Sequence, residues 1–158
     1  MGKKRMTASS MTAGERKWAA SRADLAPADY ERLADFRYLL RRFLIFSEEA
    51  AHEAGLTPQQ HQALLAIKGH RGREPLTIGV LAQRLAIRPH SAVGLLDRLA
   101  VKGLIRRCDG AGDRRQVLIE LTSTAEALLR QLSVVHRDEL KRLAPLLRGL
   151  LSAFDNGG

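Results

Sequence analysis

The feature that most constrains the fold of this chain is a rapid succession of helix start and stop signals between Thr77 and Gly103. Thr77 is a preferred N-cap residue, Pro89 is favoured at the first position of a second helix, and Gly103 is suited to end that helix. Ala86-Ile87-Arg88 leaves room only for a tight turn between the two helices. Two short helices joined by such a turn predict a helix-turn-helix.

A β-hairpin is expected directly after this helix pair. Residues 104–108 and 116–121 have the composition of short strands, and the second strand alternates in side-chain character between its two faces. The segment Asp109-Gly110-Ala111-Gly112-Asp113 lies between them and is rich in turn-forming residues. A hairpin beside a helix-turn-helix acts as a wing, so the sequence predicts a winged helix-turn-helix.

Longer helices are predicted on both sides of this winged unit. One begins at Pro27 and ends near Gly55, and its apolar residues lie on more than one side, so it needs more than one packing partner. A capping box at residues 57–60 then starts a helix that runs to about Gly69.

A further helix is predicted after the hairpin. Either Thr122 or Ser123 caps it, and Ser123 with Glu126 would form a capping box. Pro145 is expected to kink or restart this helix before a last apolar segment. The predicted fold is therefore mainly α, with one small β-hairpin.

The second helix of the pair has one face to bury and one face to present. At about 100° per residue, the arc expected to pack contains Ala92, Val93, Leu96, Leu99 and Ala100. The other face is expected to enter the major groove of a duplex. Its members are His90, Ser91, Gly94, Leu95, Asp97, Arg98 and Lys102.

The distribution of charge supports a nucleic-acid partner. The chain carries 26 Lys and Arg against 17 Asp and Glu, a net charge of +9, which nucleic acid, an anionic membrane or simple solubility could each explain. Residues 84–115 hold eight basic and three acidic residues, which is +5 of that total. Because the excess gathers on the helix pair and the hairpin, we expect them to contact the phosphates of double-stranded DNA.

Individual roles follow from side-chain chemistry. Ser91 and His90 can hydrogen-bond to base edges, and Gly94 permits close approach. Arg98 is placed for phosphates, and Arg114 at the hairpin tip suits a narrow minor groove. The predicted DNA contacts are Arg88, His90, Ser91, Gly94, Arg98, Lys102, Arg107, Arg114 and Arg115.

Other classes of function lack their signals. No Gly-rich phosphate loop, paired catalytic carboxylates or nucleophile motif is present, so an enzyme is not expected. No metal-ligand spacing joins His52, His70 and His136, and neither a metal nor a cofactor is expected. No apolar run could span a membrane, and a single cysteine suits a cytoplasmic location. We interpret Cys108 as a structural thiol, with a redox sensor as the alternative.

Together these motifs resemble the MarR family of multiple-antibiotic-resistance-type transcriptional regulators, over roughly residues 30–154. The resemblance is carried by Leu56-Thr57-Pro58-Gln59-Gln60, Leu81-Ala82-Gln83-Arg84-Leu85-Ala86-Ile87, Ser91-Ala92-Val93-Gly94-Leu95-Leu96-Asp97-Arg98-Leu99, Lys102-Gly103-Leu104-Ile105-Arg106-Arg107, Asp113-Arg114-Arg115 and Leu121-Thr122. Gly94 stands where many members carry Ser, Thr or Arg, and Ala125 stands where a Gly is common.

The resemblance implies a homodimer whose first and last helices interlock, and a repressor that binds inverted-repeat DNA near promoters. It also implies, for many members, release of DNA when a small aromatic or phenolic acid binds between the dimer helices and the DNA-binding domain. Others respond to cysteine oxidation. By this analogy the candidate effector contacts are Phe36, Arg37, Leu40, Arg41, Phe43, His61 and Leu64.

The predicted domains are a flexible basic tail over residues 1–26, dimerisation helices over residues 27–54 and 122–155, and a winged helix-turn-helix over residues 56–121. A ligand-responsive repressor that acts as a homodimer on a palindromic operator fits these features best. A winged-helix module that holds another protein is the alternative, and salt dependence separates the two.

Overall fold

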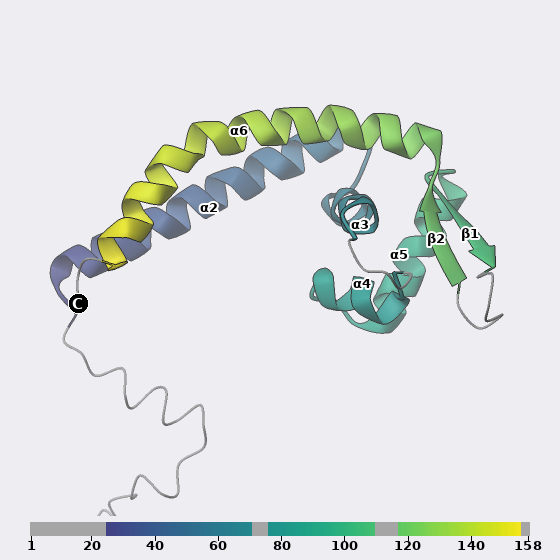
Figure 1. Ribbon diagram of the computed structural model, residues 1–158, viewed down its shortest axis with the longest axis horizontal. Coiled ribbons are helices and arrows are strands. Elements are labelled where there is room, and N and C mark those ends of the chain that lie inside the picture. The colour runs from purple at the N-terminus through teal and green to yellow at the C-terminus, as the bar shows by residue number, and fades with distance from the viewer. Residues whose placement is uncertain (1–24, 71–75, 110–116, 156–158) are drawn as a thin grey trace, which may run out of the picture.

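The computed structural model describes residues 25–70, 76–109 and 117–155. Figure 1 shows a long arm and a compact head: α2 and α6 lie side by side along the arm, and the remaining elements form the head at one end. In chain order the elements are α2 (Pro27–Glu53), α3 (Pro58–Lys68), α4 (Ile78–Arg84), α5 (Pro89–Val101), β1 (Ile105–Asp109), β2 (Val117–Leu121) and α6 (Ser123–Asp155). The predicted fold class, mainly helical with a small antiparallel hairpin, is confirmed.

Most helix ends follow the local signals. In the capping box of α3, the Gln60 backbone N–H donates to Thr57 Oγ1 at 3.2 Å, and the Thr57 backbone N–H donates to Gln60 Oε1 at 3.0 Å. Thr77 accepts in the same way from the Val80 backbone N–H at 3.3 Å. Gly103 ends α5 with a φ of +68°, in the left-handed region that favours glycine.

The core of the head is aliphatic. Leucines of α3, α4 and α5 are completely buried, and they meet Ala125, Leu129 and Leu132 from the first turns of α6. Each buried leucine contributes about 1.5–3 kcal/mol of transfer free energy. This packing fixes α6 to the head at one end, while its other end lies along α2 in the arm (Figure 1).

Of the two outcomes expected at Pro145, a kink or a restart, the restart is wrong. Helix α6 continues unbroken from Ser123 to Asp155 with Pro145 inside it, and it curves along the arm in Figure 1. A proline removes one backbone donor and crowds the preceding turn, which a long helix accommodates by bending. Packing on α2 holds both halves in one element; Leu143, just before the proline, is buried.

The start of α6 also differs from the predicted capping box. Thr122 is the cap, since its Oγ1 accepts from the Ala125 backbone N–H at 3.2 Å. Glu126 instead forms an ion pair with Lys68 at the end of α3. Across the parts of the chain that the structure describes, no helix combines the length and apolar character needed to cross a bilayer.

Candidate nucleic-acid interface

The turn between α4 and α5 sets how the two helices cross. The Ile87 backbone N–H donates to the Ala82 carbonyl at 3.0 Å, and the Ala86 N–H donates to the Gln83 carbonyl at 3.1 Å. Ala86 has a φ of +52°, a backbone conformation that residues other than glycine seldom adopt. The helix-turn-helix therefore closes through a strained left-handed residue, and Pro89 starts α5 directly after it.

The buried side of α5 is shifted from the predicted arc. Ala92, Leu95, Leu96 and Leu99 are buried, and Val93, assigned to the packed side, is exposed along with Ala100. Leu95, assigned to the free side, is therefore a core residue. The reason is tertiary: α5 packs on α3 and β1 as well as on α4, so its buried stripe faces all three partners.

The remaining face of α5 is exposed and polar at its N-terminal end. His90 and Ser91 are exposed at that end, Arg98 is exposed in the last turn of the helix, and Gly94 lies half-buried between them. A Cβ built on Gly94 would lie 3.4 Å from Arg98 Nη1, so the guanidinium folds back over the glycine. Because Gly94 has no side chain, the helix surface is recessed at this position, and the Arg98 guanidinium lies beside the recess.

Two of the predicted contact cations are bound by the protein itself. Lys102 Nζ donates to the Gly55 carbonyl at 2.8 Å and lies 3.4 Å from Gln60 Oε1, so it joins the end of α5 to the corner between α2 and α3. Arg107 Nη2 of β1 lies 2.6 Å from Asp97 Oδ1 of α5, an ion pair between the helix and the wing.

By contrast, Arg88 and Arg98 are exposed and form no ion pair with any acid in the described ranges. Sequence reasoning missed the Asp97–Arg107 pair, because residues ten positions apart on a helix and a strand give no periodic signal. Among the predicted contact residues that the structure describes, Arg88 and Arg98 are therefore the cations left free to bind phosphates.

The wing is attached firmly at its base. Strands β1 and β2 pair antiparallel from Ile105 opposite Leu121 to Asp109 opposite Val117, one residue from the predicted start of each strand. Thr122 Oγ1 donates to the Gly103 carbonyl at 2.8 Å, which closes the base of the hairpin where α6 begins. The predicted contacts Arg114 and Arg115 lie outside the described residues.

The structure does not bring the predicted effector residues together at one site. Arg37, Leu40 and Arg41 line a groove of about 410 Å³ on α2. Phe43 and His61 lie instead at the junction of α2, α3 and α6, where each ring contacts His136. Of the remaining two, Phe36 is half-buried on α2, and Leu64 is completely buried in the core of the head.

Two further sequence predictions concern sulfur and metal chemistry. Cys108 is half-buried in β1, and its Sγ lies 3.7 Å from Glu120 Oε2 on the neighbouring strand. Within the described ranges, no group of three or more His, Cys, Asp or Glu side chains is arranged to hold a metal ion.

Comparisons with known proteins agree on one family. A family model described as "MarR family" matches residues 54–116, from the end of α2 to the hairpin. The HTH-type transcriptional repressor NicR of Pseudomonas putida is 29% identical over 160 residues, which cover 90% of this chain and 99% of NicR.

Two solved structures have the same fold. A mutant of MepR from Staphylococcus aureus bound to an oligodeoxyribonucleotide has a TM-score of 0.60 at 22% identity, covering 79% of this chain and 97% of that one. CouR from Rhodococcus jostii bound to p-coumaroyl-CoA has a TM-score of 0.58 at 22% identity, covering 80% of this chain and 96% of that one.

Proposed function

Because this chain belongs to the MarR family, we propose that it is a transcriptional regulator that binds double-stranded DNA and acts as a homodimeric repressor on a palindromic operator. The observation that carries this proposal is the exposed face of α5. It presents hydrogen-bonding groups and an unpaired arginine beside a wing that is fixed at its base. A helix of this kind enters the major groove with its N-terminal residues nearest the base edges.

The proposed DNA contacts fall into two groups, those to base edges and those to phosphates. We assign His90, Ser91 and Gly94 to the base edges, because they lie at the N-terminal end of α5. Arg88 and Arg98 are assigned to phosphates, because their charges are exposed and unpaired among the described residues. Arg114 and Arg115 of the wing extend the set. Lys102 and Arg107 are instead engaged within the head, by the Gly55 carbonyl and the Asp97 carboxylate.

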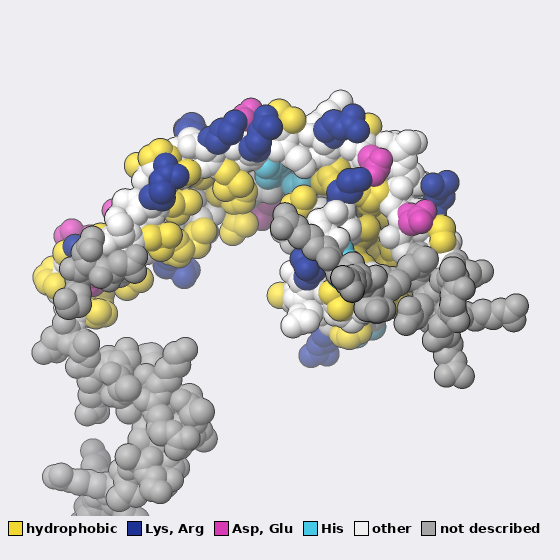
Figure 2. All heavy atoms as spheres, viewed as in Figure 1, with side chains coloured by type: hydrophobic (Ala, Val, Ile, Leu, Met, Phe, Trp, Pro, Cys, Tyr) yellow, Lys and Arg dark blue, Asp and Glu magenta, His cyan; other side chains and the backbone are white. Residues whose placement is uncertain are grey.

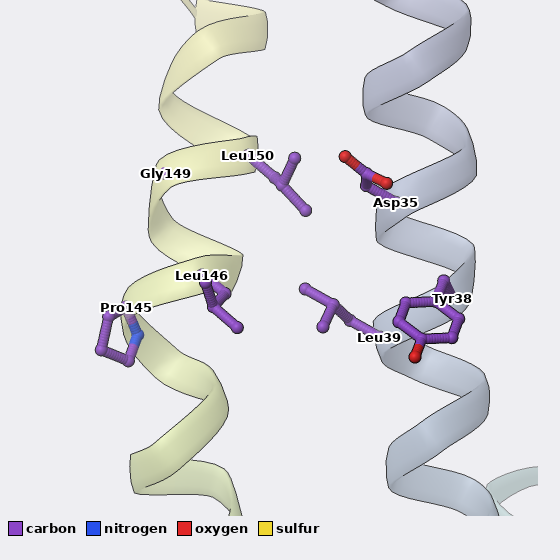
Figure 3. A pocket seen from close by; sticks show the side chains of 7 residues that line it. All are labelled: Asp35, Tyr38, Leu39, Pro145, Leu146, Gly149 and Leu150. Atoms are coloured by element: carbon purple, nitrogen blue, oxygen red, sulfur yellow. The ribbon is translucent and has the colours of Figure 1, made fainter.

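The arm supplies a dimer surface in this proposal. Figure 3 shows Leu39 of α2 and Leu146 and Leu150 of α6 facing one another across an apolar groove of about 380 Å³. Figure 2 shows hydrophobic side chains gathered along the inner side of the arm. Large apolar residues that stay exposed on a protomer usually mark a protein interface. They include Leu33, Tyr38, Leu40, Leu44, Leu146 and Leu151.

A dimer explains how so small a head can select a site. One recognition helix contacts few base pairs, whereas two helices related by a two-fold axis contact two half-sites about 34 Å apart. The proposed operator is therefore an inverted repeat with half-sites about one helical turn apart.

A small aromatic or phenolic acid is the proposed effector. Support comes from CouR, a protein of the same fold that was solved with p-coumaroyl-CoA. In this chain Arg37 and Arg41 offer cations beside Leu40 in the groove on α2, a combination suited to an acid with an apolar body. Neither a membrane nor a cofactor has a role in this proposal, and the cytoplasm is the compartment in which such a regulator meets DNA.

The experiment that tests the proposal starts with selection of duplexes from a random pool, followed by fluorescence anisotropy on the recovered site. A DNA-binding dimer gives an inverted repeat, and its affinity falls steeply with salt, with a log–log slope of about −0.9 per phosphate contact. A flat salt response with no enriched sequence supports the alternative, a winged-helix module that binds another protein.

A further inference from the structure

Two histidines meet at the point where the arm joins the head. His61 lies on α3 and His136 on α6, and their ring centroids are 4.7 Å apart. His61 is only 3% exposed, and its Nδ1 has no hydrogen-bond partner among the residues that the structure describes. Figure 2 shows histidine side chains at this inner corner of the molecule.

The two rings are in very different states. His136 Nδ1 lies 2.7 Å from the Leu132 carbonyl, and its Nε2 lies 2.8 Å from Ser47 Oγ. The carbonyl can only accept, so His136 Nδ1 carries a proton, while Nε2 and the Ser47 hydroxyl can share a hydrogen bond in either direction. Both ring nitrogens of His136 therefore have hydrogen-bond partners, whereas His61 retains an unused buried nitrogen.

Aromatic rings enclose the pair on the α2 side. Phe43 and Phe46 approach His136 edge-on, with ring centroids 6.0 and 5.5 Å from it. Neither histidine lines the grooves on α2 or between α2 and α6 described above. Because His61 is almost completely buried and lines neither groove, the ligand best suited to its free nitrogen is a proton.

We propose that the His61–His136 pair is an acid-sensitive switch, in which protonation of His61 separates α3 from the arm and weakens DNA binding. This inference rests on the proposed function, because DNA affinity is its readout. A charge on His61 would lie beside a second imidazole and aromatic rings, so the protonated ring favours a position closer to water. Helix α3 packs on α2, α4, α5, α6 and β2, and its movement therefore shifts the recognition helix relative to the arm.

The surrounding charges do not offset a proton on His61. On α6, Glu139 is paired with Arg142, and on α2, Glu48 and Glu49 are exposed. On the elements of the head, the Lys102 ammonium at the end of α5 donates to Gln60, Arg84 of α4 is exposed, and Glu120 of β2 lies against Cys108.

The pKa of His61 is lowered from its ordinary value of 6.5, first by burial and then by the charge of His136, and no described carboxylate contributes. A histidine with a lowered pKa binds fewer protons in the folded state than in the unfolded state. Well above pH 6.5, His61 is neutral in both states and does not destabilise the folded protein. As the pH falls below 6.5, the unfolded state binds the proton more readily, so the free energy of unfolding decreases progressively.

The test measures operator affinity between about pH 7.5 and about pH 5.5 at constant ionic strength, the range in which histidine titrates. The wild-type protein should lose about tenfold in affinity toward acid, a coupling typical of allosteric proteins. His61→Gln should remove this loss. His61→Leu provides a second neutral replacement of similar size, and circular dichroism confirms that both variants are folded. A parallel loss in wild type and both variants overturns the proposal.

Two further variants test whether the acid response depends on the interaction between His61 and His136. His136→Gln removes the charge that lowers the pKa of His61, so the midpoint of acid release should move to higher pH; an unmoved midpoint contradicts the pairing. His52→Gln is the matched control, since His52 is an exposed histidine of α2 that belongs neither to the pair nor to the proposed DNA face, and the full acid response should persist. Loss of that response in His52→Gln would show that the acid effect does not depend specifically on the His61–His136 pair and would overturn the switch.

A measurement without DNA keeps this inference distinct from the proposed function. In an NMR titration of the ring protons, His61 should titrate below 6.5, and the unfolding temperature should fall over the same pH range. If no duplex binds at neutral pH, the proposed function fails while this titration still stands. If the operator binds but His61 titrates at or above its ordinary pKa, the switch fails alone.

Discussion

Arg98 and Ser91 lie on the same exposed face of α5 but present different chemistry to a duplex. A guanidinium binds phosphates of any sequence, whereas a hydroxyl at the N-terminal end of the helix can distinguish bases. The local backbone is also a residue-scale feature, because Gly103 and Ala86 both adopt positive φ values, at +68° and +52°.

For Arg98→Ala we expect weaker binding to every duplex, with a salt slope lower by about one unit. Ser91→Ala should instead reduce discrimination between operator variants, with the slope unchanged. Anisotropy titrations on matched and mismatched duplexes at several salt concentrations distinguish the two. Identical behaviour of both variants would contradict the assignment.

Ala86→Gly should raise the free energy of unfolding by about 0.5–1 kcal/mol. Glycine removes the strain of the left-handed turn, and the gain is partly offset by the greater entropy of the unfolded chain. Gly103→Ala is the reciprocal control and should be destabilising by about 1 kcal/mol, since a Cβ there meets no atom within 4 Å and only φ opposes it. Urea denaturation measures both, and equal signs for the two changes would refute the explanation.

At the scale of elements, the Asp97–Arg107 pair couples the recognition helix to the wing. Both side chains are substantially exposed, so the pair adds little stability. Its larger effect is on the surface potential, because Asp97 puts an acid on the side of α5 that we propose faces DNA, and the pair neutralises the charge of Arg107 beside it.

Asp97→Asn should therefore increase affinity for all duplexes and steepen the salt slope by about one unit, because Arg107 becomes free to bind a phosphate. Arg107→Gln should do the opposite, since it leaves Asp97 unneutralised. Anisotropy at low and moderate salt measures both variants; weaker non-specific binding by Asp97→Asn would show that the pair orients α5 rather than tuning its charge.

Element boundaries could largely be predicted from the sequence, because caps such as Thr57 and stops such as Gly103 act locally. Burial on α5 could not, because Leu95 is covered by elements that are distant in sequence. The histidine pair could be predicted only in part. His136 follows Leu132 by four residues and precedes Leu143 by seven, so it occupies the buried stripe of α6, a visible signal whose partner on α3 only the fold reveals.

At the scale of the whole molecule, the arm exposes apolar surface that the head does not need for its own core. Leu146 is 56% exposed on the protomer and lines the groove of Figure 3 together with Asp35. A substitution there leaves the core of the head intact and tests the assembly.

Leu146→Glu should shift the protein from dimer to monomer in analytical ultracentrifugation, because a second carboxylate beside Asp35 opposes apolar association. Operator affinity should fall about a hundredfold or more as the two heads bind independently. Gln131→Glu is the control, since Gln131 is an exposed residue of the same helix outside this groove. A dimer that survives Leu146→Glu would place the interface elsewhere.

The unbroken course of α6 has a mechanical consequence. Thr122 ties the base of the wing to the first turn of a helix of 33 residues, so one continuous element, about 50 Å along its curved axis, joins the wing to the far end of the arm. A pivot of about 5° at the far end of such a lever displaces the near end by about 4 Å, a large fraction of the rise of one helical turn. In the proposed dimer, small movements at the interface between the two protomers would thereby be amplified into a change in the distance between their wings.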